Sequence, residues 1–485
     1  MKPRYVLGFV AAGAMASPLA VGAANAGVLE LYGRANVSLD HLDNGSTATV
    51  MPADVYAMPF NGDLTPEGGE LPGSGTSSQY LTNNSSRLGI RGSQYLGAGL
   101  TGIFQYETTV NLGDGGNLFG AGRTSFLGVQ GAFGTAVAGR IDDPLKTAMD
   151  QHQLFADQLG DAGNFLGYGV SPALVLIEQD MQLDGPVEGG EGEGASTGRV
   201  DIRGAESLSD ELARNGVIDT SLDNDRFGNQ AAAEGTYGQF IRGQHQNRHN
   251  HTLGYTTPSV NGFSGTFVYQ PDQGSNSPVE NRYAVEGRFD NQVGEGHLFV
   301  SLGWLRATEN LGDAAFVVDV DPASPNFFLD PDEDLEVVGA DDQDVWQLLA
   351  SYRMPGEWRI MGVVQQVDNF SLIEDNNHRV YGGGVGINVL PDTEVKGHVM
   401  RFDHREYSDM DATMYAIGVD HHLSQRTMVY GTWAMTRNDD RVDAQMNAFG
   451  HGTSYTTNGN TDQGEGQPVF GEDQWGLSLG LRHDF

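Results

Sequence analysis

Apolar and polar residues alternate along most of this chain. In the segment 28–39, Leu31 and Leu39 fall on one face and Arg34 on the other, and the segment 475–485 repeats this pattern. Strand side chains point alternately to opposite faces, so a period of two predicts strands with one apolar side. Apolar residues at helical spacing are almost absent, which predicts a fold built from strands.

We predict sixteen strands of this kind. Most are close to the length of about 9–11 residues that a tilted strand needs to cross a bilayer. Their expected positions are 28–39, 85–93, 99–110, 122–131, 134–140, 247–256, 261–270, 281–290, 296–307, 344–352, 357–368, 378–388, 393–404, 412–421, 425–436 and 475–485.

The connections between these strands alternate between short and long. The short ones are tight-turn sequences such as Met354-Pro355-Gly356 and Leu390-Pro391-Asp392. Short turns at one end and long loops at the other are typical of a transmembrane up-and-down barrel. The sequence therefore predicts an all-β fold, an antiparallel barrel of about sixteen strands with long extracellular loops. The long loops fall near 40–84, 111–121, 141–246, 271–280, 308–343, 369–377, 405–411 and 437–472.

The N-terminus has the features of a signal peptide. Lys2 and Arg4 form a basic start, an apolar stretch follows, and residues 24–26 supply a small-residue cleavage pattern. A membrane anchor is the alternative, but a Ser-Pro step interrupts the apolar run and leaves it too short to span a bilayer. We expect residues 1–26 to be a signal peptide and residues 27–485 to form the exported barrel.

Composition narrows the possible partners. The chain has 27 Lys and Arg residues against 64 Asp and Glu residues, a net charge of −37. This excess argues against nucleic acid, because phosphate binding requires basic clusters. Thirteen acidic and three basic residues in the segment 178–225 indicate a solvated loop. The absence of cysteine excludes disulfides and thiolate chemistry.

A second acidic loop leaves two interpretations open. Asp330, Asp332 and Asp334 occupy the first, third and fifth positions of a calcium-binding loop. Leu335 stands where such a loop requires glycine, and Asp341 where it requires glutamate. An acidic solvated loop is therefore the preferred interpretation, and we expect no metal site.

Seven groups of short motifs follow one another from the first strand to the last. They are Leu31-Tyr32-Gly33-Arg34; 84–92 with 96–100 and 104–107; 123–128; 133–140; 255–258 with 261–263; 423–427 with Tyr430; and the closing Gly480-Leu481-Arg482-His483-Asp484-Phe485. Together they resemble the trimeric general-diffusion porins of Gram-negative outer membranes. The resemblance covers the strands well and the long loops poorly.

The resemblance implies an outer-membrane porin whose water-filled channel passes ions and small hydrophilic solutes by passive diffusion. It also implies a homotrimer, no enzymatic activity and no cofactor. By the same resemblance, the strand that ends at Phe485 would be the signal recognised by the outer-membrane barrel assembly machinery. The third long loop would fold back into the barrel and narrow it. Here that loop carries a large insert at about 162–246, which leaves open which of its acids reach the constriction.

We expect the constriction to lie between a basic wall and this acidic loop. Strand parity points seven arginines inward, Arg248 and the six of the expected wall. Inside the barrel charges stay hydrated, whereas a charge on the lipid face costs about 2–4 kcal/mol at the midplane. Opposed charges would orient dipolar solutes, and arginines that merely brace the loop are an alternative of equal standing. The expected wall is Arg34, Arg87, Arg91, Arg123, Arg140 and Arg482, and the expected loop acids are Asp142, Asp143, Asp150, Asp157 and Asp161.

The sequence leaves ion preference and several rival functions open. Arginines at the constriction favour anions, whereas the acidic loops at the channel mouth favour cations. Because the acidic excess is so large, we expect a preference for cations. A substrate-specific channel with a binding site at the constriction is the alternative within transport. A barrel hydrolase would need a nucleophile–base pair, and an adhesive barrel would have a plugged lumen. No phosphate loop or nucleophile elbow is present, and the glycines at 382–384 indicate a strand that lumen side chains pass closely.

Overall fold

The computed structural model describes residues 27–43, 78–113, 120, 122–168, 170–172, 175–177, 198–201, 245–271, 279–309, 315–319, 334–339, 341–406, 410–440, 442–447, 450–451, 471 and 473–485. The expected signal peptide, most of the acidic segment 178–225, and Asp330 and Asp332 lie outside these residues. Within the described ranges, no helix has the length and apolar character needed to span a membrane.

Most of the described chain is β-structure. The barrel strands are β1 (Val28–Asp43), β2 (Ser78–Asn83), β3 (Arg87–Gly97), β4 (Leu100–Thr109), β5 (Ser125–Gly131), β6 (Gly134–Asp142), β10 (Arg248–Thr256), β11 (Phe263–Gln270), β12 (Val279–Val293), β13 (Gly296–Glu309), β16 (Gln343–Met354), β17 (Trp358–Asp368), β18 (His378–Leu390), β19 (Thr393–His404), β20 (Ala412–His422), β21 (Thr427–Asn438) and β23 (Gln474–Asp484). The other elements are α2 (Pro144–His152), η1 (Asn164–Tyr168), β7 (Val170–Pro172), β8 (Val175–Ile177), β9 (Gly198–Asp201), β14 (Ala315–Asp319), β15 (Asp334–Gly339), η2 (Phe370–Leu372) and β22 (Val442–Ala444).

The barrel strands pair antiparallel, and the sheet closes on itself. β1 pairs with β23 from Arg34 opposite Asp484 to Asp43 opposite Trp475. On its other edge β1 pairs with β3 along its first half and with β2 along its second half, so these two strands share one position. The seventeen strands of the sheet therefore fill sixteen positions. The predicted sixteen-stranded barrel is confirmed.

Apolar side chains cover the outer face of this barrel. Leu29, Leu81 and Leu127 are 72%, 69% and 70% exposed, whereas Asn36 and Ser38 on the inner face of β1 are buried. This distribution is the reverse of that in a water-soluble protein. It fits strands whose apolar side faces lipid and whose polar side faces a lumen.

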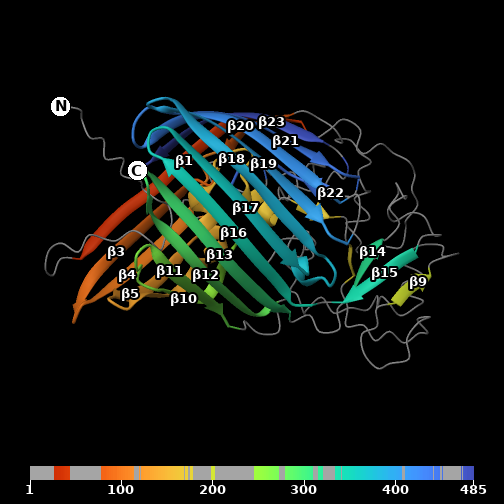
Figure 1. Ribbon diagram of the computed structural model, residues 1–485, viewed down its shortest axis with the longest axis horizontal. Helices are drawn as coiled ribbons and strands as arrows, with labels where there is room; N and C mark the ends of the chain where they lie inside the picture. The colour runs from red at the N-terminus through yellow and green to blue at the C-terminus, as the bar shows by residue number, and fades with distance from the viewer. Residues whose placement is uncertain are drawn as a thin grey trace.

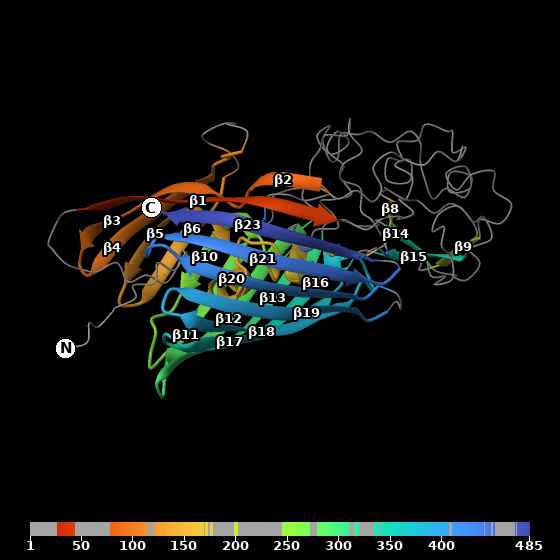
Figure 2. The same cartoon turned by 90° about the horizontal axis from the view of Figure 1, so that it is seen from above.

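A small second sheet lies beyond one end of the barrel. In Figures 1 and 2 its strands β14, β15 and β9 lie at the end opposite the C-terminus. It has the strand order β8-β14-β15-β9 and joins segments that the sequence analysis assigned to two separate long loops. Its strands are short and their partners lie far apart in the chain, so no local pattern predicted them.

The chain after β6 folds back inside the barrel, as the family resemblance implied. We call residues 143–172 the inward loop. Its helix α2 starts where the Asp143 carboxylate accepts a hydrogen bond from the Lys146 backbone N–H at 2.8 Å and Pro144 takes the first helical position. This helix was not among the elements predicted from the sequence, although an Asp-Pro step is an ordinary start signal.

Glycines on the barrel wall make room for the inward loop. In each case a Cβ on the glycine would lie within about van der Waals contact of an apolar side chain of the loop, or closer. The close passage predicted for the glycine-rich strand is confirmed at Gly384. The contacts are Gly303 with Leu145 (2.8 Å), Gly384 with Leu154 (2.5 Å), Gly418 with Phe155 (2.9 Å) and Gly476 with Leu159 (3.1 Å).

Two other loops also send residues into the interior. β22, which follows β21, pairs with β7 of the inward loop, and the Gly160 backbone N–H donates to the Met446 carbonyl at 2.8 Å. Phe370 and Leu372 of η2 are 4% and 0% exposed. Only the third loop was expected to fold inward, because the family resemblance implied it for that loop alone.

We expect Gly384→Ala to destabilise the folded barrel by about 1–3 kcal/mol, because the added methyl group overpacks against Leu154 and His398. Gly287→Ala is the matched control, since nothing lies within 4 Å of its Cβ position. The measurement is the urea midpoint of the refolded protein, followed by tryptophan fluorescence. Equal midpoints for the two variants would contradict this account of the wall.

Candidate functional site

The inward loop meets the barrel wall at a group of ion pairs. Asp157 Oδ2 accepts hydrogen bonds from Nη1 of Arg34 and, at 3.3 Å, from Nη1 of Arg87. Arg34 Nε donates to Asp484 Oδ1 at 2.7 Å, and Asn36 Nδ2 donates to the Asp157 carbonyl at 2.9 Å. One loop aspartate therefore bonds to β1 and β3, through two arginines that the alternation had pointed inward.

Glu107 of β4 joins the same region. Arg123 Nε donates to Glu107 Oε1 at 2.6 Å, and the Tyr32 hydroxyl donates to Glu107 Oε2 at 3.0 Å. Glu107 was not among the expected site residues, although it alternates with the exposed Tyr106 and so has inward parity. Phe126 of β5 is partly buried and packs against an interior apolar cluster.

Asp142, at the end of β6, brings in two more cations. Arg248 Nε lies 3.1 Å from Asp142 Oδ1, and Lys146 Nζ lies 3.9 Å from it. Lys146 also donates to Asp150 one helical turn further along α2. Lys146 was missed with the helix that carries it. Arg248 had inward parity in the sequence but was not included in the expected wall.

These ion pairs form a single cluster of charges. Its members come from the inward loop and from several strands, and they lie close enough to interact electrostatically. We call it the charged cluster. In the part of the chain that the structure describes, it comprises the cations Arg34, Arg87, Arg123, Lys146, Arg248 and Arg482 and the carboxylates Glu107, Asp142, Asp150, Asp157 and Asp484.

Two aspartates of the inward loop respond to these surroundings in opposite directions. Burial alone would raise the pKa of Asp157, but Arg87 and Arg34 outweigh it and hold the pKa below its usual range. Asp157 therefore stays ionised, and its bridge persists, into acidic solution. Burial, with a contribution from Asp150, raises the pKa of Asp161 well above its usual range. Asp161 accepts the backbone N–H groups of Asp157 and Gly163 at 2.9 and 2.8 Å.

Four of the expected site residues lie outside the charged cluster: Asp161, described above, and the three that follow. Asp143 is 0% exposed and caps α2. Arg91 forms a two-bond pair with Glu30, at 2.8 and 3.0 Å, near the start of β1. Arg140 shares the parity of the exposed Ala138 and donates to the exposed Asn250. The expectation that Arg140 points into the lumen is wrong, because Val137 and Ile141, 5% and 2% exposed, occupy the inward face of β6 and Arg140 alternates with them.

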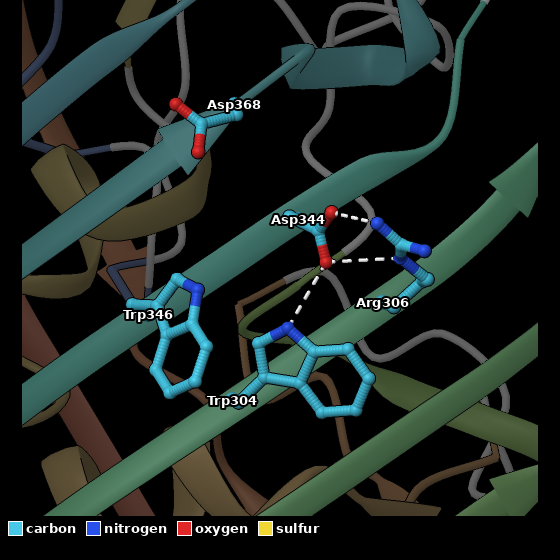
Figure 3. Close-up of a pocket in the computed structure, with 5 residues that line it drawn as sticks. All are labelled: Trp304, Arg306, Asp344, Trp346 and Asp368. Atoms are coloured by element: carbon cyan, nitrogen blue, oxygen red, sulfur yellow. Dashed lines mark hydrogen bonds and ion pairs between the residues drawn. The ribbon is translucent and has the colours of Figure 1, made fainter.

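A hollow of about 480 Å³ lies on the outside of the barrel and is not the channel. In Figure 3 the Trp304 ring and the Arg306 guanidinium both turn to Asp344, with Trp304 Nε1 and Arg306 Nε each 3.0 Å from Asp344 Oδ1. Along β13 and β16 a leucine pair, a tryptophan pair and this ion pair follow in register. Apolar, aromatic and charged tiers in this order are typical of a membrane–water interface. The lining residues are Trp304, Arg306, Asp344, Trp346 and Asp368.

The charged cluster is suited to acting on solutes through its electric field. It is built from paired ions on a rigid wall and a buried loop, which hold charges of both signs in fixed places. Across the described ranges, no group of three or more metal-ligating side chains is arranged to hold an ion. A closed barrel with an apolar exterior and such a charged interior defines an outer-membrane channel.

Comparison with known proteins gives the family. A family model described as Gram-negative porin matches residues 6–441. Outer membrane porin protein 32 of Delftia acidovorans is 25% identical over 416 residues, which cover 83% of this chain and 85% of that one. Major outer membrane protein P.IA of Neisseria meningitidis is 35% identical over 126 residues, covering 22% and 33%. The solved anion-selective porin from Comamonas acidovorans superposes with a TM-score of 0.54 at 20% identity, covering 95% of this chain and 100% of that chain.

The chain belongs to the Gram-negative porin family. It is an outer-membrane channel for passive diffusion, and the proteins of this family are channels rather than enzymes.

We expect Arg87→Gln to lower the anion-to-cation permeability ratio by about fivefold, the effect of roughly 1 kcal/mol that one charge exerts at close range in water. Arg91→Gln is the matched control, because it removes the same charge from the same face of β3 but outside the charged cluster. The measurement is the reversal potential in a salt gradient across a planar bilayer. A larger shift for Arg91→Gln would place the selective charges elsewhere.

Proposed function

We propose that the charged cluster is the constriction of a general-diffusion porin and selects solutes by size and charge. The observation that carries this proposal is the bridge from Asp157 to Arg34 and Arg87, which links the inward loop to the wall. Charges of both signs produce a transverse field that acts on any dipolar solute. A site for one solute would instead be mostly apolar with a few placed polar groups. These features favour general diffusion over a substrate-specific channel.

The arginines of the cluster have two roles in this proposal. Arg34 and Arg87 are 8% and 9% exposed at their side chains, which suits bracing of the loop. Arg482 is 22% exposed, which suits contact with the solution in the lumen. Bracing and selection are therefore divided among residues of one cluster, and neither role excludes the other.

We propose that the constriction prefers anions. The charged cluster has six cations and five carboxylates among the described residues, so its net charge is opposite to that of the chain. The name of the Comamonas acidovorans porin, anion-selective, supports this choice. The acidic excess at the channel mouth favours cations, but at 0.1 M salt its field is screened beyond a Debye length of about 10 Å.

Assembly completes the proposal. We propose that residues 1–26 are removed as a signal peptide, that the mature chain forms a homotrimer, and that the barrel assembly machinery reads the strand ending at Phe485. An apolar hollow of about 580 Å³ on the outer face of β1, β20, β21 and β23 supports contact with lipid or a neighbouring protomer. Catalysis and a cofactor have no part in this function.

Refolded wild-type protein should give stepwise conductance in a planar bilayer, with a reversal potential of the sign that anion preference requires. Asp157→Asn should raise the anion-to-cation permeability ratio by about fivefold, because it removes one negative charge from the constriction.

Flux into liposomes should fall with solute size and not saturate. Saturable flux of one solute would favour the substrate-specific alternative, and silence from folded protein would refute an open pore.

Phe485→Ala should refold in detergent but reach the outer membrane of cells in much smaller amounts. The backbone N–H and C=O of Phe485 bond to Gly33 at 3.1 Å whatever the side chain, so barrel closure survives the change. Leu479→Ala is the control, since it removes another exposed apolar side chain from β23. The measurement is the ratio of membrane-inserted to total protein, and equal ratios for both variants would count against recognition of Phe485.

A further inference from the structure

We propose that Lys396 of β19 is the positioning residue that holds the inward loop at the constriction, an inference that rests on the function proposed above. Its ammonium group donates three hydrogen bonds: to the Leu154 carbonyl at 2.8 Å, Gln158 Oε1 at 2.9 Å and Asp420 Oδ2 at 2.7 Å. Two of the three acceptors belong to the loop, and one belongs to the neighbouring strand. Lys396 therefore ties the loop to the wall by its own side chain.

The surroundings of Lys396 make these bonds consequential. Its side chain is 1% exposed and points inward, since it alternates with the exposed Val395 on β19. The Phe155 ring lies 4.6 Å from Nζ, and Phe155 is 0% exposed. A buried ammonium group is costly unless all its protons are bonded. The seated loop supplies acceptors that the wall alone lacks, so the ion and the loop stabilise each other in this position.

The position of Lys396 relative to the charged cluster gives it a role in conduction. Gln158, which accepts a bond from Lys396, is the next residue after Asp157, whose carboxylate reaches Arg34 and Arg87. The same short turn is thus attached to β19 on one side and to β1 and β3 on the other. If the bond from Lys396 is lost, the turn keeps the arginine bonds and the longer bonds of Gln158 with Asp420 and Thr432, each 3.3 Å. The position of Asp157 then fluctuates, and the open area of the channel fluctuates with it.

The test compares three variants of the full chain. Lys396→Met keeps an apolar side chain of similar length. Gln158→Ala changes no wall residue and removes the loop acceptor of Lys396 together with the bonds of Gln158 to Asp420 and Thr432. Glu394→Gln is the matched control: it lies two residues from Lys396 on β19 and weakens an ion pair that joins Arg359 to Glu394 at 2.7 Å within the wall. A single cysteine, Leu159→Cys, reports the seating of the loop, because the chain has no other cysteine and Leu159 is 0% exposed against Gly476.

Both loop-releasing variants should show noisier open-channel current and closure at lower voltage than wild type. In the Leu159→Cys background they should react with a water-soluble thiol reagent about tenfold faster, the factor expected from loss of one hydrogen bond to a charged donor. Glu394→Gln should match wild type in both measurements. The conductance of the wild type tests the proposed function separately, since a silent wild type would refute that function and not the seating of the loop.

Wild-type noise, closing voltage and thiol reactivity in folded Lys396→Met would show that the loop is positioned without Lys396, and would overturn the proposal. If Lys396→Met does not fold, Gln158→Ala decides by the same readouts, because its change lies in the loop and leaves the barrel strands intact. Equal effects in Glu394→Gln and Gln158→Ala would also overturn it, since they would indicate a general weakening of the wall.

Discussion

In the hydrocarbon of a bilayer, backbone N–H and C=O groups find no water, so a sheet can cross only if its two edges bond to each other. Here that bond joins the two ends of the described chain, β1 and β23, over ten residue pairs. Closure defines an inside and an outside for every strand, and thereby gives the alternating side chains their lipid and lumen faces. The inward loop, the charged cluster and the outer apolar belt all depend on this pairing.

The inside is divided between two kinds of environment. On one side Leu154, Phe155 and Leu159 pack in an apolar cluster with wall residues such as Met400 and Met414. On the other side Asp157 points to the arginines of β1 and β3. Asp157 has a φ of 58°, a conformation that aspartate tolerates better than most residues. The turn at Asp157 therefore lets neighbouring residues of one loop contact the apolar cluster and the charged cluster at the same time.

The loops cooperate rather than act one at a time. β22 pairs with β7, and Val442, Ala444 and Met446 are 0% exposed within the same apolar cluster as the inward loop. Wall glycines and alanines provide the space for this filling, since larger side chains at Gly384 or Gly418 would overlap the loop. The lumen is thus narrowed by a packed interior with a charged border, and this border is the constriction that we propose.

The sequence by itself determined the barrel. Alternation and turn chemistry are local properties of the backbone, so they predicted the strands, their order and the inward parity of Arg34, Arg87 and Arg482. Only the tertiary structure decided which charges meet. Asp157 lies 123 residues from Arg34, and no local pattern relates them. Alternation also left the inward face of β6 undecided, because apolar residues occupy both of its faces, and only the burial of Val137 and Ile141 shows that Arg140 points away from the lumen. The position of the helix that carries Lys146, and the bonds of Lys396 to the inward loop, depend on packing across the lumen. The sequence shows which residues are present, but it does not show which of them come into contact.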